Sequence, residues 1–271
     1  MGLRIQEYHE LGFVNDFMFA KVMRNRKLCK QLLEVILDIA IDQIEYLEEQ
    51  KTIDHSINAK GVRLDVYVKD DKHTIYNVEM QTSNPKNLPK RSRYYQGMID
   101  LNVLQKGEDY NKLKKSFVIF ICTEDIFEKG RHIYTFENLC IQDSEIHLND
   151  EAIKVFLNPI SEMNDVDEEL NNFLLYIAKG EPVDEFTSEL EKEVVAARKN
   201  KGWEEEYMTL RTLEMERFNE GKAEGKAEGK AETFIKSIDN LISNMGLTLE
   251  AACQALGSSI QEYEESKKLL Q

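Results

Sequence analysis

The sequence predicts an α/β (α+β) fold with a central mixed sheet flanked by helices and a mostly helical C-terminal extension. Two alternating runs of apolar and polar residues between positions 61 and 81 surround a polar break, which is typical of an antiparallel β-hairpin. Residues 117–122 are continuously apolar, as expected of a buried central strand. From residue 165 the pattern becomes acidic and helical, which predicts the extension.

Length and composition are typical of a globular protein. The 271 residues suggest one or two domains, and 42% hydrophobic content is enough for a packed core. The four cysteines show no C-x-x-C spacing, no secretory signal opens the chain, and no apolar run approaches the roughly 18 residues that span a bilayer. The five histidines lack the spacing of a zinc site. We therefore expect a cytoplasmic protein with reduced thiols and no membrane partner.

The first part of the chain predicts a helix and then a strand. Apolar residues recur at near-helical spacing between residues 13 and 40, and either Asn15 or Asp16 can cap this helix. Residues 41–60 alternate weakly between apolar and polar, which predicts the first strand of the sheet.

The predicted hairpin carries the candidate site. Because successive side chains of a strand point to opposite faces, Asp65 lies on the polar face of the first strand. Asn77, Glu79 and Gln81 share the polar face of the second strand. A turn centred near Asp71 places Asp65 opposite Asn77 and diagonal to Glu79, where two carboxylates can share a cation such as Mg²⁺. The alternative is a hairpin with an ordinary solvated face.

A helix is predicted after the hairpin, over residues 89–105. Pro85 and Pro89 mark a loop and a helix start, an apolar stripe follows, and Gly107 ends the helix. Its first turns are basic, which opposes the helix macrodipole, so an anionic ligand explains these cations better than helix stability does. Tyr95 on the same helix is a candidate to face that ligand.

The remaining strands complete the predicted sheet. Residues 131–136 and 152–157 have strand-like patterns and follow the apolar segment 117–122. The predicted order through the first domain is three strands, a helix and then the buried central strand.

Charge is unevenly distributed along the chain. The net charge of -15 argues against DNA binding, yet residues 17–33 contain five basic residues and no acids. Residues 82–116 contain eight basic residues and three acids. Both segments flank the hairpin, so positive charge lies where a phosphodiester backbone would need it. The alternative is that these residues simply cover exposed helix faces. The candidate DNA contacts are Lys86, Lys90, Arg91 and Arg93.

The predicted domain organisation has four parts. Residues 1–165 form the domain that contains the sheet, 166–219 a helical extension, 220–232 a linker and 233–271 a small helical segment. The linker repeats Gly-Lys-Ala-Glu, and a period of four stacks like charges while three glycines weaken a helix. We favour a hydrophilic, marginally helical linker. The alternative is close helix pairing in an oligomer through the Gly and Ala faces.

The last segment predicts three short helices. Gly246 and Gly257 end the first two, and Ser259 with Glu262 offers a capping box for the third. Residues 246–266 contain four acids and no Lys or Arg, which argues against a DNA-binding helix-turn-helix. We expect partner binding or a homo-oligomer formed through these helices.

The hairpin resembles the PD-(D/E)-X-K nuclease superfamily. Asp65 in an apolar strand, a short turn, and then a hydrophobic-Glu-hydrophobic-Gln run ending at Gln81 carry this resemblance. The order of further motifs is similar to the Rpn family of recombination-promoting nucleases and transposases, over roughly the first 160 residues. These motifs are Asn15-Asp16-Phe17-Met18-Phe19, Arg91-Ser-Arg-Tyr-Tyr95, Gly107-Glu-Asp-Tyr110 and the strand at 117–122.

The resemblance implies a restriction-endonuclease-like fold and a metal-dependent DNA endonuclease that hydrolyses phosphodiester bonds, associated with recombination or mobile elements. Asp65 and Glu79 would ligate Mg²⁺, or alternatively Mn²⁺ or Ca²⁺, and Gln81 would position the attacking water or the phosphate. Asp16 and Tyr95 would support catalysis. Asp16 is included because the first helix of many such nucleases presents an acid to the metal.

One position departs from the superfamily pattern. Gln81 stands where the superfamily has a lysine, and an amide cannot supply that positive charge. The missing lysine and the acidity of the chain motivate an alternative function, a catalytically inactive interaction protein that keeps the nuclease fold.

Overall fold

The structure is a computed structural model, and it describes residues 6–53 and 62–270. The chain divides into two compact units, Met1–Glu204 and Glu205–Gln271, which we call the N-terminal and C-terminal units. Part of the expected first strand and the first residue of the expected hairpin fall within 54–61, outside the described residues.

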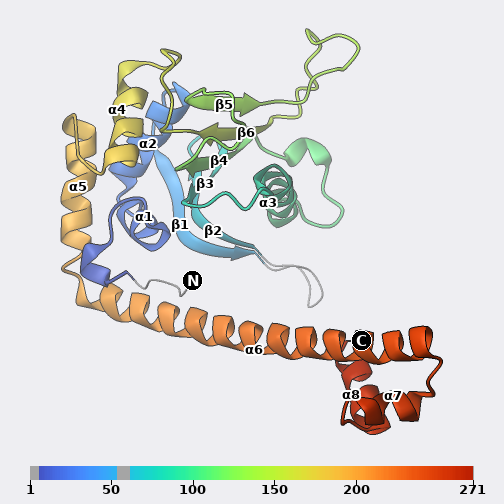
Figure 1. Cartoon of the computed structure of the whole chain (residues 1–271). Coiled ribbons are helices and arrows are strands. Elements are labelled where there is room, and N and C mark those ends of the chain that lie inside the picture. Colours follow the sequence, from blue (N-terminus) through green and yellow to red (C-terminus); the bar gives the residue numbers. More distant parts are fainter. Residues whose placement is uncertain (1–5, 54–61, 271) are drawn as a thin grey trace. The chain divides into compact units, whose positions relative to one another are not determined.

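A six-stranded mixed sheet forms the centre of the N-terminal unit, in the order β1-β2-β3-β4-β6-β5 (Figure 1). The first three strands pair antiparallel, β4 lies parallel to both β3 and β6, and β5 is antiparallel to β6. This arrangement confirms the predicted mixed sheet. The strands are β1 (Ile44–Ile53), β2 (Val62–Asp70), β3 (Ile75–Gln81), β4 (Ser116–Cys122), β5 (Ile133–Phe136) and β6 (Ala152–Leu157).

Two helices replace the single helix that the sequence predicts over residues 13–40. They are α1 (Asp16–Val22) and α2 (Arg26–Leu37). The break occurs because the Asn25 side chain accepts hydrogen bonds from the backbone N–H groups of Lys27 and Leu28, which starts a new helix. The apolar spacing continues across the break and therefore hides it.

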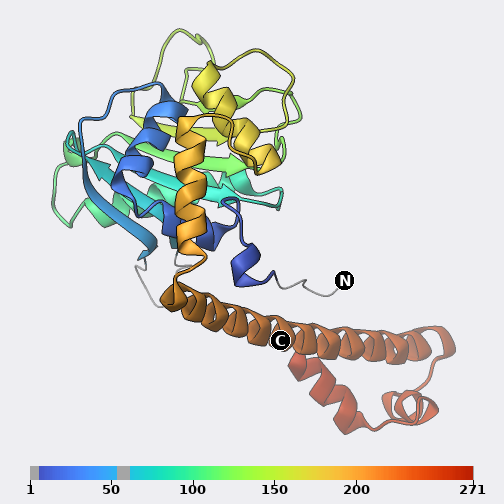
Figure 2. The same cartoon turned by 90° about the vertical axis from the view of Figure 1, so that its left-hand side faces the viewer.

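Helices cover both faces of the sheet. Figures 1 and 2 show α3 (Leu88–Val103) on one face, with α1, α2, α4 (Glu168–Lys179) and α5 (Glu185–Ala197) on the other side. α1 contacts β1, β2 and β3, while α5 packs against α1 and α2, and α4 packs against α2 and α5. Every residue of β4 is buried, as the apolar sequence of this strand predicts. Short 3₁₀ helices lie at Tyr8–Glu10 and Tyr110–Lys112.

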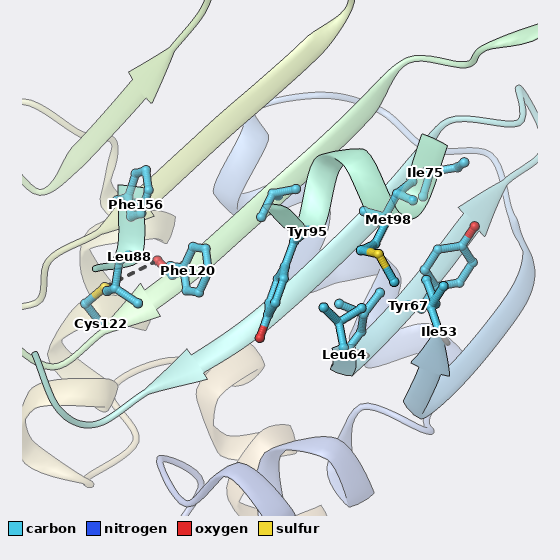
Figure 3. Close-up of a cluster of buried hydrophobic side chains, with 13 residues drawn as sticks. Ile53, Leu64, Tyr67, Ile75, Leu88, Tyr95, Met98, Phe120, Cys122 and Phe156 are labelled. Atoms are coloured by element: carbon cyan, nitrogen blue, oxygen red, sulfur yellow. Dashed lines mark hydrogen bonds between the residues drawn. The ribbon is translucent and has the colours of Figure 1, made fainter. Parts of the chain in front are cut away.

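A hydrophobic cluster fills the space between α3 and the sheet (Figure 3). Phe120 of β4 is its centre, since its ring stacks on Tyr95 of α3 at 6.1 Å and on Phe156 of β6 at 5.4 Å between centroids. This cluster fixes the position of α3 over the middle of the sheet. Its other members include Tyr67, Leu88, Met98 and Ile99.

The C-terminal unit is helical. α6 (Lys201–Met245) includes residues 220–232, so the segment expected as a marginally helical linker is helical in the structure. Within the unit, the end of α6 packs against α7 (Leu249–Ala255) and α8 (Ile260–Leu269) around Ile238, Ala252, Cys253 and Tyr263.

The predicted ends of these helices are confirmed. Gly246 and Gly257 follow α6 and α7 with positive φ angles of 66° and 69°, and the Ser259–Glu262 capping box is present. In the described part of the chain, no helix is both long enough and apolar enough to cross a bilayer.

Candidate active site

Asp65 and Glu79 belong to adjacent strands, β2 and β3. The pairing is Val66 with Val78 and Tyr67 with Asn77, so the register places Asp65 opposite Glu79. The expected register, with Asp65 opposite Asn77 and diagonal to Glu79, is therefore wrong by two residues.

The turn explains this register. The turn spans residues 70–74 and centres on Lys72 rather than on Asp71, because the backbone N–H of Asp70 bonds to the carbonyl of Thr74. The Asp70 carboxylate holds the turn closed, since it accepts hydrogen bonds from the N–H groups of Lys72 and Thr74 at 3.0 and 2.8 Å. His73 provides the positive φ angle, 64°, that the turn requires.

Each carboxylate is bound to the backbone of the opposite strand. Glu79 Oε1 accepts a hydrogen bond from the Asp65 N–H at 3.1 Å, and Asp65 Oδ2 accepts one from the Met80 N–H at 3.1 Å. These side-chain bonds continue the strand pairing beyond Val66 and Val78. Both acids are thereby held at fixed positions where the pairing of β2 with β3 ends.

The polar face of β3 is buried rather than solvated. α3 covers it, and Glu79 is fully buried. The alternative of an ordinary solvated hairpin face is therefore wrong. A buried carboxylate needs a partner, and Arg91 of α3 supplies one through an ion pair of 2.8 Å between its Nη2 and Glu79 Oε2.

Arg91 also contacts two other candidate residues. Its Nη1 donates to Gln81 Oε1 at 2.8 Å, and its Nε donates to the Tyr95 hydroxyl at 2.7 Å. The Gln81 amide nitrogen donates to the carbonyl of Ser83 at 2.7 Å. The structure therefore brings Glu79, Gln81, Arg91 and Tyr95 into one hydrogen-bonded group.

Burial raises the pKa of both acids, and repulsion from neighbouring carboxylates adds to the effect at Asp65. Burial raises the pKa of Asp65 well above its usual value, and the negative charges of Glu79 and Asp16 raise it further. Burial also raises the pKa of Glu79, to about 7, although the Arg91 charge and the hydrogen bond from the Asp65 N–H act in the opposite direction. Two neighbouring carboxyl groups with raised pKa values form a site that favours positive charge.

Asp16 lies close enough to Asp65 for its negative charge to raise the pKa of Asp65. It is the first residue of α1, and Asn15 is the residue that caps this helix, by accepting a hydrogen bond from the Met18 N–H. Helix capping therefore does not explain why an acid stands at position 16. The packing of α1 against β2 and β3 brings this third acid near the pair.

A family model described as PD-(D/E)XK nuclease family transposase matches residues 13–196. The chain belongs to this family. No curated protein and no solved structure matches the chain. The matched region begins just before α1 and ends in the last turn of α5, so it contains the sheet, its covering helices and all of the site described above.

PD-(D/E)XK nucleases typically use divalent metal ions, and the residues present fit a hard cation. Asp65 and Glu79 offer only oxygen ligands, and a divalent cation would offset the burial and the repulsion that together raise the pKa of Asp65. Among the described residues, no three His, Cys, Asp or Glu side chains form a cluster that could enclose a metal. The donor set suits Mg²⁺, which is usually held by one or two carboxylates and keeps several waters.

The candidate DNA contacts fall into two groups. Lys86, Lys90 and Arg93 are exposed, on α3 and the loop before it, whereas Arg91 points inward to Glu79. The basic segment 17–33 is engaged in ion pairs within the chain. Lys21 and Arg24 contact Glu49, Lys27 contacts Glu189, and Lys30 contacts Glu34.

Sequence reasoning missed the place of Arg91 in the site, because it grouped this residue with its basic neighbours as a DNA contact. One signal was available. Arg91 and Tyr95 are four residues apart and so share a helix face, and Tyr95 was already a candidate. The contact with Glu79 could not be seen, since it depends on how α3 packs on the sheet.

Proposed function

We propose that this PD-(D/E)XK family member is a metal-dependent DNA endonuclease that hydrolyses phosphodiester bonds. The observation that carries the proposal is the pair of carboxylates just beyond the end of the pairing between β2 and β3, each held by a backbone N–H of the opposite strand. Two fixed acids with raised pKa values beside an arginine are a site prepared for a cation and a phosphate.

Asp65 and Glu79 are the residues that would hold Mg²⁺, with Mn²⁺ or Ca²⁺ as alternatives. Bound there, a divalent cation would lower the pKa of a water and neutralise charge on the phosphate. The backbone bonds to Asp65 and Glu79 keep both acids in place, so that little reorganisation accompanies the reaction. Asp16 adds negative charge near Asp65, which further favours a cation at this position.

Gln81 would position the water or the phosphate through its amide. Water supplies the new oxygen of the phosphate, the bond from phosphorus to the leaving sugar oxygen breaks, and that oxygen takes up a proton. No covalent intermediate is needed, and no strand joining follows from this chemistry. Tyr95 would support the site by holding Arg91 in place.

Lys86, Lys90 and Arg93 would contact the DNA backbone. They are exposed and lie on α3 and its preceding loop, the same segment that supplies Arg91 to the site. Contacts of this kind fix the orientation of the duplex without reading its sequence. A substrate bound along α3 would have a phosphate near Glu79 and Gln81.

The finer assignment, to recombination-promoting nucleases of the Rpn type acting in recombination or on mobile elements, rests on the order of the sequence motifs.

We propose four parts for the chain, with a nuclease-like domain over residues 1–165, a helical extension to 219, the repeat at 220–232 and a C-terminal segment. That last segment would mediate homo-oligomer formation, because its acidic helices do not suit DNA. We propose that the protein acts in the cytoplasm.

A second function is favoured by one observation. Glu79 is fully buried and paired with Arg91, and Gln81 carries no charge, which suits an inert nuclease fold that serves as an interaction protein. The two functions differ in what Asp65 does. In a working site its carboxylate binds a divalent cation, whereas in an inert fold it binds none.

Calorimetric titration of the whole protein with Mn²⁺ separates these functions. The nuclease predicts saturable binding to the wild type that is lost in Asp65→Asn and kept in Asp143→Asn, a matched change in an exposed loop. Equal binding by all three proteins would show that the cation lies elsewhere. No binding by any of them would favour the interaction protein.

A further inference from the structure

The Arg91 side chain is held at the candidate site by several contacts. Its guanidinium donates three hydrogen bonds, to Glu79 at 2.8 Å, to Gln81 at 2.8 Å and to Tyr95 at 2.7 Å. The guanidinium carbon also lies 5.0 Å from the ring centroid of Tyr95 and 5.3 Å from that of Phe120. Figure 3 shows these two rings side by side in the core between α3 and the sheet.

The Arg91 guanidinium has N–H groups that these three hydrogen bonds do not use. A guanidinium has five N–H groups in a rigid plane, and the three bonds use one on each nitrogen. One N–H remains on Nη1 and one on Nη2. The side chain is 30% exposed, so its outer edge can meet a ligand while the inner edge stays bound to Glu79 and Gln81.

The Arg91 guanidinium lies beside the position at which the family motif has a lysine. The family motif ends in lysine, and Gln81 stands at that position without a charge. Arg91 Nη1 lies 2.8 Å from Gln81 Oε1, so the guanidinium brings a positive charge to the place where the motif lysine is missing. It arrives from α3 rather than from β3.

We propose that Arg91 is the catalytic cation of this site, with its two remaining N–H groups bound to non-bridging oxygens of the scissile phosphate. The proposal rests on the proposed nuclease function and deepens it. A planar fork suits two phosphate oxygens, and a donor that is already held in place stabilises the charge of the transition state without reorganisation. Gln81 and Tyr95 then act as positioning residues for Arg91.

A structural role for Arg91, limited to neutralising buried Glu79, predicts different behaviour. Loss of a structural ion pair lowers stability and leaves the rate of the folded fraction unchanged. Arg198 provides a matched control, because it is 28% exposed and its contacts, with Glu191 at 3.7 Å and with the Leu11 carbonyl at 2.8 Å, lie outside the site.

The test measures the single-turnover cleavage rate at saturating protein, DNA binding without metal, and unfolding by urea, all on the full chain. Arg91→Gln should lower the rate about 100-fold or more, as loss of a preorganised donor does, while DNA binding falls far less. Arg198→Gln should lose stability without losing the rate. The double variant Arg91→Gln/Gln81→Lys moves the charge to the motif position. Its cleavage rate should be at least tenfold higher than that of Arg91→Gln.

Each outcome decides the proposal. A folded Arg91→Gln that cleaves within threefold of an active wild type would overturn the catalytic role and leave the nuclease function intact. If Arg91→Gln does not fold, the double variant decides, because it keeps a cation beside Glu79. A folded and inactive double variant would overturn the proposal. A wild type that cleaves nothing would contradict the nuclease function itself, and this role with it.

Discussion

The substitution Glu79→Gln tests the electrostatic state of the site in the metal-free protein. Glu79 is fully buried and its pKa is raised from 4.5 to about 7. Between these values the folded protein holds a proton that the unfolded chain has lost, so Glu79 lowers stability progressively as pH rises through this window. A pKa difference of about 2.5 lowers the free energy of unfolding by roughly 3 kcal/mol once the pH is above both pKa values.

The comparison of wild type with Glu79→Gln cancels the titrating groups that do not interact with Glu79, and it measures Glu79 together with its effect on the pKa of Asp65. We expect the free energy of unfolding of the wild type, relative to the variant, to fall by about 2–3 kcal/mol between pH 5 and pH 8. Urea unfolding in the presence of EDTA measures it. The single tryptophan, Trp203, lies in the N-terminal unit near Lys21 and Arg24 of the α1 region, so its fluorescence reports that unit.

Glu124→Gln serves as the control, since Glu124 is an exposed glutamate of the same unit, and it should parallel the wild type. Adding Mg²⁺ should reverse the trend in the wild type, because the cation binds the ionised carboxylates and competes with protons. A difference between wild type and Glu79→Gln that stays constant from pH 5 to pH 8 would show that the pKa of Glu79 is not raised by burial.

Three further substitutions test the packing, the hairpin turn and a helix cap of the fold. Phe120→Ala should lower the free energy of unfolding by about 3–5 kcal/mol, since it empties the centre of the cluster under α3; a loss below 1 kcal/mol by urea unfolding would contradict this packing. Asp70→Ala should cost about 1–3 kcal/mol, because it leaves turn N–H groups and the Tyr76 hydroxyl without their acceptor, and an unchanged unfolding midpoint would argue against the turn. Ser259→Ala should cost about 1 kcal/mol by removing the cap that Glu262 completes. Hydrogen exchange should show this loss in α8 alone, and faster exchange in the sheet would be inconsistent with separate units.

Local patterns predicted much of the fold. The strands at 117–122, 131–136 and 152–157 appear in the structure as β4, β5 and β6 because apolar runs and alternation reflect burial on each side of a strand. The glycines and the capping box of the C-terminal helices were also predictable, since they act within a few residues of themselves.

What the sequence could not predict depends on contacts between distant residues. The register of the hairpin follows from the hydrogen bonds of one side chain, Asp70, and alternation alone allows a shift of two residues. The burial of Glu79 follows from the packing of α3 on the sheet. The ion pairs of Lys21 with Glu49 and of Lys27 with Glu189 join residues far apart in the chain, so a basic segment that resembled a DNA-binding surface is largely paired internally.

Cleavage of supercoiled plasmid DNA tests whether the protein is a metal-dependent nuclease that uses Asp65. We would compare the full-length wild type with Asp65→Asn and with Ser259→Ala, a change outside the site, each with Mg²⁺ or Mn²⁺ and with EDTA. We predict metal-dependent nicking by the wild type and by Ser259→Ala, and no nicking by a folded Asp65→Asn. Nicking that persists in Asp65→Asn, or that proceeds in EDTA, would contradict this prediction.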